Sequence, residues 1–296
     1  MKKTARYFLM LLTLCLLFLA TAYAVLYVKN NSDTAVVTES ELEVAFERGA
    51  GWLLDNEAVL MDTHIPALWE ILIEAAEASG HEGLRRLGYD YRRKNRVGYR
   101  GGPLAFQVYG DDYADYASVD LSIYPYYDLL MMYAYSCDDL LAQLETVQAQ
   151  LDSDFCDRSY PLSPACKTHQ LMGFSYFRGN QCRDKKLVEG TIHSLLNDIR
   201  KQLQFDVRVV DVYLQRVMML LRLAGEEHGV RQAWLRQIVD AQNDDGGWDD
   251  FMPLIAVGNG RSIGFSKRAI KIARPASDFH ATVQAVLLLA LVHDES

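Results

Sequence analysis

The chain has 296 residues, and 50% of them are hydrophobic, so it can bury a sizeable core in one or two domains. Its 30 basic and 39 acidic side chains give a formal net charge of -9. An acidic chain without a run of basic residues lacks the electrostatic footprint of a nucleic-acid-binding protein, so we expect no nucleic-acid partner.

The amino-terminal segment predicts an exported protein. Three basic residues among the first six precede an apolar run at 7–28, which is long enough to span a bilayer. Basic residues before such a run keep the amino end in the cytoplasm, so the following domain is expected on the periplasmic or extracellular side. Ala22-Tyr23-Ala24 also resembles a signal-peptidase site. Residues 1–28 are therefore either a membrane anchor, which we favour, or a cleaved signal peptide.

The cysteines agree with export. Besides Cys15, the chain has four cysteines in its central part: Cys137, Cys156, Cys166 and Cys182. An even number in an exported protein predicts two disulfides, with three connectivities open. A thiolate metal site is the alternative, but no C-x-x-C spacing supports it. We expect no cofactor, because no motif supports a metal either.

The rest of the chain predicts one helical domain. Residues 29–39 are polar and lack periodicity, which predicts a tether before a domain at 40–296. Ser40 followed by Glu43 resembles a capping box that opens the first helix. From there, amphipathic stretches alternate about five times with nearly all-apolar ones.

Helices that are apolar on every side must be buried. Amphipathic-then-apolar pairs therefore predict an all-α fold, with the apolar helices inside. An α/α toroid, here an incomplete barrel of about five helical hairpins, and an open superhelix both fit this pattern. The best strand is Ala105–Tyr109, expected as an edge hairpin. Long loops are predicted at Val97–Val119, Asp152–Ala165 and Met252–Ala276, and such loops are often functional.

The segment Val230–Asp250 predicts a helix that ends at an acidic turn. Gly246 and Gly247 permit backbone angles that other residues resist. Trp248 is expected to fold back onto the helix end, and Gln242 is expected to bond the free carbonyls there.

Several segments resemble a known superfamily. Trp234-Leu235-Arg236 followed by Ala241-Gln242-Asn243-Asp244-Asp245-Gly246-Gly247-Trp248 resembles the QW repeat of squalene–hopene cyclases. Arg48-Gly49-Ala50-Gly51-Trp52-Leu53-Leu54 is similar to the front half of that repeat. Asp278-Phe279-His280-Ala281-Thr282 is similar to the start of an inner helix in protein prenyltransferase β-subunits. The resemblance implies an α/α toroid.

The chemistry of these families is not implied. The chain lacks the D-x-D-D acid motif of the cyclases. Of the zinc-binding set of the prenyltransferases only His280 has a counterpart, and no Asp-x-Cys precedes it.

One set of polar residues points to a site. Each of four apolar helices starts with a similar tripeptide: Asp62-Thr63-His64, Lys167-Thr168-His169, Asp211-Val212-Tyr213 and Asp278-Phe279-His280. If these helices run parallel, the tripeptides share one mouth. Helix amino ends suit anions, and their field keeps a histidine neutral. The expected catalytic residues are His64, His169, His280, Tyr213 and Asp278. The expected ligand-binding residues are Asp62, Asp211, Tyr124 and Trp248.

Structural roles compete with each of these expectations. Asp and Thr before a helix are ordinary N-caps. A metal held by the histidines is a weaker alternative, because their spacings exceed 100 residues. Four aspartates offer oxygen ligands for calcium, or form a solvated turn: Asp244, Asp245, Asp249 and Asp250. A group of tyrosines could line a sugar-binding wall, or pack on the domain: Tyr109, Tyr113, Tyr116, Tyr124, Tyr126 and Tyr127.

Two functions fit these patterns. The first is a membrane-tethered module that holds a polar ligand or partner, such as a glycan or an envelope protein, at the mouth. The second is an envelope glycan-processing enzyme, a lyase or hydrolase, with the mouth histidines as general acid and base. We favour the first because no motif names a reaction.

Overall fold

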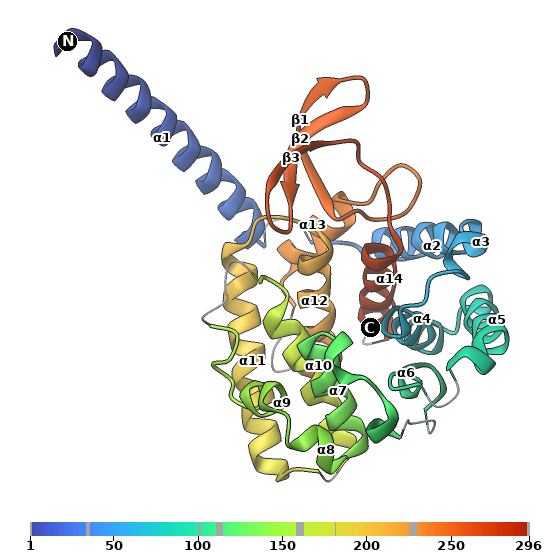
Figure 1. Cartoon of the computed structure of the whole chain (residues 1–296). Helices are drawn as coiled ribbons and strands as arrows, with labels where there is room; N and C mark the ends of the chain where they lie inside the picture. The colour runs from blue at the N-terminus through green and yellow to red at the C-terminus, as the bar shows by residue number, and fades with distance from the viewer. Residues whose placement is uncertain are drawn as a thin grey trace.

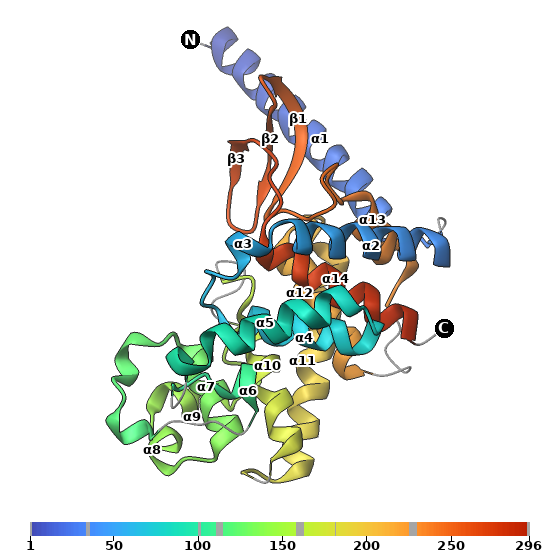
Figure 2. The same cartoon turned by 90° about the vertical axis from the view of Figure 1, so that its right-hand side faces the viewer.

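Most of the described chain is helical, as predicted. The structure is a computed structural model that describes residues 2–33, 36–99, 102–110, 115–157, 163–180, 182–224 and 230–294. A long helix and a small sheet project from a helical body (Figures 1 and 2).

The helices are α1 (Lys2–Asn31), α2 (Glu39–Asp55), α3 (Glu57–Leu60), α4 (Pro66–Ser79), α5 (Glu82–Tyr99), α6 (Phe106–Tyr109), α7 (Tyr126–Ser136), α8 (Asp139–Ala142), α9 (Glu145–Gln150), α10 (Cys166–Gly179), α11 (Lys185–Phe205), α12 (Asp211–Ala224), α13 (Gln232–Asp240) and α14 (Phe279–Asp294). Two 3-10 turns, η1 (Tyr116–Ser118) and η2 (Leu121–Ile123), precede α7. The strands β1 (Phe251–Gly258), β2 (Arg261–Ser266) and β3 (Ile270–Ala273) form an antiparallel sheet in that order.

The helices predicted to be buried form the core. Residues 211–220 of α12 and 281–290 of α14 are all buried. α14 packs between α4 and α12, α10 packs against α12 and α7, and α6 lies against α4. The amphipathic helices cover this core: α2 lies on α14, α5 on α4, and α11 on both α10 and α12. The sequence pattern therefore predicted correctly which helices are inner and which are outer.

The two tryptophan-bearing segments that resemble each other dock together. The Arg48 guanidinium donates to the carbonyl oxygen of Asn243 at 2.7 Å. The Trp52 indole donates to the carboxylate of Asp245 at 3.1 Å. The acidic turn after α13 is therefore held by α2, which lies almost 200 residues earlier in the chain.

Trp248 folds back onto α13 as predicted, because its indole donates to the carbonyl of Ile238 at 2.8 Å. The expectation for Gln242 was wrong. Its amide donates to the carbonyls of Ala45 and Gly246, each at 2.8 Å, and so joins the turn to α2 rather than bonding the end of its own helix.

The predicted capping box was displaced by two residues. Thr38 is the N-cap of α2, its hydroxyl accepts from the backbone N–H of Glu41, and the Glu41 carboxylate accepts from the backbone N–H of Thr38. The helix begins at Glu39, so Ser40 and Glu43 lie inside it and cannot cap it.

The loop predicted at Met252–Ala276 is wrong, because that stretch forms the three-stranded sheet. Asn259 and Gly260 have φ values of 53° and 68°, the conformation of a tight hairpin turn between β1 and β2. The Asn-Gly pair flanked by Ile and Val was the local signal for it.

The predicted strand at Ala105–Tyr109 is wrong too, because these residues enter the short helix α6. Phe106, Gln107 and Val108 are all buried, so the side chains do not alternate between two faces as in a strand. The predicted loop at Val97–Val119 contains this helix and η1. Its residues 100, 101 and 111–114 lie outside the described part of the chain, and Tyr113 is one of them.

The four central cysteines form two disulfides, as predicted. Cys137 pairs with Cys182, and Cys156 pairs with Cys166, with Cα–Cα distances of 5.1 and 5.6 Å. The first joins the end of α7 to the segment after α10, and the second fixes the loop before α10 to its first residue.

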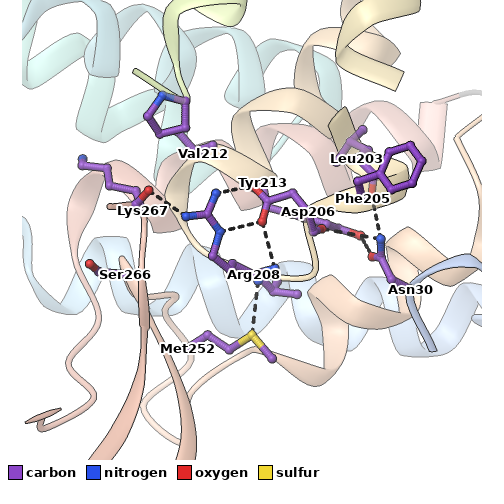
Figure 3. Close-up of polar contacts among 12 residues, drawn as sticks. Asn30, Leu203, Phe205, Asp206, Arg208, Val212, Tyr213, Met252, Ser266 and Lys267 are labelled. Atoms are coloured by element: carbon purple, nitrogen blue, oxygen red, sulfur yellow. Dashed lines mark hydrogen bonds and ion pairs between the residues drawn. The ribbon is translucent and has the colours of Figure 1, made fainter. Parts of the chain in front are cut away.

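The amino-terminal helix α1 is the one described helix that is long and apolar enough to cross a membrane, and its most apolar window is not buried. It continues to Asn31, so the tether predicted at 29–39 is shorter than expected. Asn30 is buried: its amide donates to the carbonyl of Leu203 at 2.6 Å and accepts from the Tyr213 hydroxyl at 2.6 Å (Figure 3). The end of α1 is thereby fixed to α11 and α12.

Candidate functional site

The starts of five buried helices border one cavity of about 600 Å³, which we call the helix-start pocket. Its walls come from the first two turns of α4, α7, α10, α12 and α14, from α6 and the loop before it, and from the turn between β2 and β3. The polar residues on these walls are His64, Gln107, Tyr126, Tyr127, Asp128, His169, Asp211, Gln215, Lys267, Arg268, His280 and Gln284.

Three of the predicted histidines meet here. His64, His169 and His280 all border the pocket, although each precedes the next by more than 100 residues. The sequence register of the helix starts therefore placed these side chains correctly at one end of the core.

Asp211 lies at the floor of the pocket with 1% of its surface exposed. Its carboxylate accepts from Lys267 Nζ at 2.9 Å and lies 3.3 Å from His280 Nδ1. Burial alone would raise the pKa of Asp211, but the hydrogen bonds and charges of His280 and Lys267 lower it to about 2. Asp211 is therefore a fixed negative charge that orients both neighbours.

His280 is held from both sides. With Nδ1 facing Asp211, its Nε2 lies 3.0 Å from the amide nitrogen of Gln284, one helical turn later. In this arrangement Nδ1 donates to the Asp211 carboxylate, and Nε2 faces the Gln284 amide. The Gln284 amide oxygen is buried without a hydrogen-bond partner among the described residues.

His169 is a neutral imidazole at pH 7. Burial lowers its pKa to about 4, and repulsion from His280 adds to the effect. Its ring centroid lies 4.3 Å from that of Tyr127, at the start of α7. A neutral imidazole offers one donor and one acceptor nitrogen, which suits a ligand hydroxyl.

The pKa of Asp128, next to Tyr127, is shifted in the opposite direction to that of His169. Burial raises the pKa of this carboxyl to about 6. In mildly acidic solution the pocket therefore holds a protonated carboxyl, Asp128, and a neutral imidazole, His169.

The amino ends of α4, α7 and α10 reach the pocket without a capping side chain. Their N-cap residues, Ile65, Pro125 and Ala165, make no side-chain cap hydrogen bond. Together with Lys267 and Arg268 they give the pocket a positive end that favours anions.

The other predicted site residues lie elsewhere. Tyr213 points away to Asn30 (Figure 3). Asp278 caps α14 by accepting from the backbone N–H of Ala281 at 2.8 Å. Asp62 pairs with Lys94 at 2.9 Å on the surface.

Two more predicted ligand contacts are separate from the pocket. Tyr124 ends η2 and is not among the residues that border the pocket. Trp248 is 1% exposed and lies beside a second cavity, of about 450 Å³, between Lys29 and the base of β1.

The predicted calcium ligands do not form one group. Asp245 bonds Trp52 and the Ser277 hydroxyl. Asp249 and Asp250 instead lie with Asp278, ligand atoms within 4.8 Å of one another.

Each carboxylate of that second group already has a structural partner. Asp249 accepts from the backbone N–H of Ala276, Asp250 accepts from Lys271, and Asp278 accepts from the backbone N–H groups of Ala281 and Asp250. The carboxylates of Asp249 and Asp278 therefore cap a loop and a helix, and that of Asp250 is in an ion pair.

Sequence reasoning missed Asp128, Gln284, Lys267 and Arg268. Asp128 lies in the first turn of α7 and Gln284 one turn after His280 in α14, so a search that covered the first two turns of each apolar helix would have found both. Lys267 and Arg268 belong to the turn between β2 and β3, and they were missed because this stretch was predicted to be a loop without strands.

Against known proteins, no family model, no curated protein and no solved structure matches this chain.

Proposed function

We propose that this is an exported, membrane-anchored α/α-toroid protein whose helix-start pocket binds an acidic saccharide. The observation that carries the proposal is the convergence of His169, His280 and Asp211 on one cavity with the basic β2–β3 turn.

The chemistry of the walls fits such a ligand. The rings of Tyr126 and Tyr127 offer flat faces for a sugar ring, and the amides of Gln107 and Gln215 are hydroxyl partners. Lys267 and Arg268 suit the ligand's carboxylate or phosphate. A pocket of about 600 Å³ is within the usual range for small ligands.

The toroid is part of the proposal. Neighbouring inner helices pack in the order α4, α14, α12, α10 and α7. α6 lies between α4 and α7 in the sequence and packs against α4. This is the order expected of inner helices in a nearly closed ring. The shared register of the helix starts, which all border one cavity, supports parallel inner helices.

Export and anchoring rest on α1 and the disulfides. α1 is exposed and long enough to span a bilayer, and two disulfides fit an oxidising compartment. The Tyr23 hydroxyl donates to the carbonyl of Phe205 at 2.9 Å, and cleavage after Ala24 would remove this contact, so it supports an anchor that stays attached to the domain.

Calorimetric titration of the purified full chain with trigalacturonate and with neutral galactotriose tests the ligand class. We expect binding of the acidic trimer only. Arg268→Gln should weaken it about tenfold, the usual effect of losing one charge-assisted hydrogen bond. Arg261→Gln removes the same charge at the far tip of the hairpin and is the matched control. Equal affinity for both trimers, or equal loss in both variants, would refute the proposal.

Asp128 favours catalysis as a second candidate function. Its pKa of about 6 and the pKa of His169 of about 4 leave a proton donor and a proton acceptor together near pH 5. If the bound saccharide is cleaved, chromatography of the products should show loss of turnover in Asp128→Asn and His169→Gln with affinity retained. Turnover that survives both substitutions would remove these residues from any reaction.

A further inference from the structure

The β-sheet has one apolar face. Cross-strand partners lie on the same side of a sheet, so the paired residues form rows. One face carries two such rows: Ile255, Ile263 and Ile272, then Met252, Phe265 and Ile270. The other face carries mostly small or polar residues: Ala256, Ser262 and Ala273, then Pro253, Gly264 and Lys271.

Much of the apolar face is exposed. Ile255, Ile270 and Ile272 expose 61%, 67% and 52% of their surfaces, and Leu254 and Val257 of β1 expose 42% and 48%. Scattered apolar residues are common on protein surfaces, but a contiguous group of large aliphatic ones marks an interaction site.

The sheet is also basic, although the chain as a whole is acidic. Residues 251–276 contain no acidic side chain and five basic ones: Arg261, Lys267, Arg268, Lys271 and Arg274. The partner of this segment should therefore combine an apolar interior with negative charge.

The sheet and α1 project from the same side of the helical body (Figures 1 and 2). Asn30 fixes the end of α1 to α11 and α12, while Arg208, in the loop between these helices, donates to the carbonyl of Lys267 at the base of the sheet at 2.9 Å (Figure 3). Both projections are thus held by the same part of the molecule.

We infer that the β-sheet is a second membrane contact, whose Ile-rich face enters the interface of a bilayer containing anionic lipids. This inference rests on α1 being a membrane anchor, as proposed above. A bilayer surface supplies both an apolar layer and negative headgroups. Pairing this face with the sheet of a second copy would instead bring two basic segments together, each with Arg261 and Arg274 outside the helix-start pocket.

The test uses the full chain in vesicles of phosphatidylcholine and phosphatidylglycerol, in a Cys15→Ser background. Ile255→Cys carries an environment-sensitive fluorophore, and nitroxide-labelled lipids serve as quencher. Leu187→Cys is the matched control, because Leu187 exposes 62% of its surface and Ile255 exposes 61%. Leu187 lies near the start of α11, far from Phe205 at the other end, whose ring contacts α1. We expect blue-shifted, lipid-quenched emission at position 255 and neither effect at position 187.

A second measurement distinguishes failure of the sheet contact from failure of the α1 anchor. Resistance to alkaline extraction reports the anchor. Protein that resists extraction but shows no lipid quenching at position 255 would overturn the membrane contact alone, and protein that is extracted would overturn the anchor as well. Shielding of the probe from aqueous iodide without lipid quenching would indicate a protein partner and refute the inference. Removing phosphatidylglycerol should weaken the quenching, because the basic residues then lose their partners.

Discussion

Two aspartates of the pocket have opposite pKa shifts because their neighbours differ. Asp128 and Asp211 are both aspartates at helix starts, yet the pKa of Asp128 is raised to about 6 and that of Asp211 is lowered to about 2. Both feel the cost of burial, but only Asp211 has Lys267 and His280 as charged partners. A charged partner thus decides which carboxylate is ionised in mildly acidic solution.

The raised pKa of Asp128 predicts a stability effect. The folded protein keeps a proton that the unfolded chain releases between pH 3.8 and 6, so Asp128 lowers stability as the pH rises through that window. Asp128→Asn stays neutral and should gain about 1–2 kcal/mol relative to the wild type between pH 4 and pH 7.5, allowing for partial exposure. Urea unfolding at both values measures it, and Asp139→Asn controls for loss of a carboxylate. A constant difference between Asp128→Asn and wild type would contradict the prediction.

His169 changes stability with pH in the opposite direction. Its pKa of about 4 lies below the ordinary value of 6.5, so the unfolded chain binds a proton first and stability falls as the pH drops from 6.5 to 4. His169→Gln should unfold with a weaker pH dependence in that window, measured by the same titration. His193→Gln, on the exposed face of α11, is the control. An unchanged pH dependence in His169→Gln would show that the ring titrates normally.

At the scale of elements, the acidic turn after α13 depends on one backbone approach. Gly246 has a φ of 95°, and a Cβ added there would lie 2.5 Å from the carbonyl oxygen of Arg48. The same turn places Asp245 against Trp52, so the turn joins the two segments that resemble each other.

Gly246→Ala should therefore destabilise the protein by about 2–4 kcal/mol, through the strained backbone and the contact with α2. Gly51, within α2, has open space around its Cβ position, and Gly51→Ala should be neutral or stabilise by up to about 1 kcal/mol. Thermal unfolding of the two variants compares them directly. Equal effects would mean that the turn is not constrained as described.

At the scale of the whole molecule, the end of α1 is part of the folded domain. The buried Asn30 amide connects α1 to the carbonyl of Leu203 and the hydroxyl of Tyr213, and Tyr27 contacts the ring of Phe205 (Figure 3). Cleavage after Ala24 would leave these contacts in place, whereas cleavage after residue 31 would remove them.

Asn30→Leu should destabilise the domain by about 2–4 kcal/mol, because two buried polar groups lose their partner. Asn31→Leu keeps the helix and alters a partly buried neighbour, so it should cost less. Denaturant unfolding in detergent measures both. If the two variants matched the wild type, α1 would not be coupled to the domain.

The sequence determined the helical class, the inner helices, the disulfide cysteines and the shared position of three histidines, because these follow from local periodicity and from helix starts. Tertiary packing decided which starts face the pocket: Tyr213 turns to Asn30 and Asp278 caps its own helix, while His280 and Asp211 meet. It also paired the cysteines and placed Lys267 of the sheet beside Asp211, 56 residues earlier. Such contacts join residues far apart in the chain, and no local pattern encodes the distance between them.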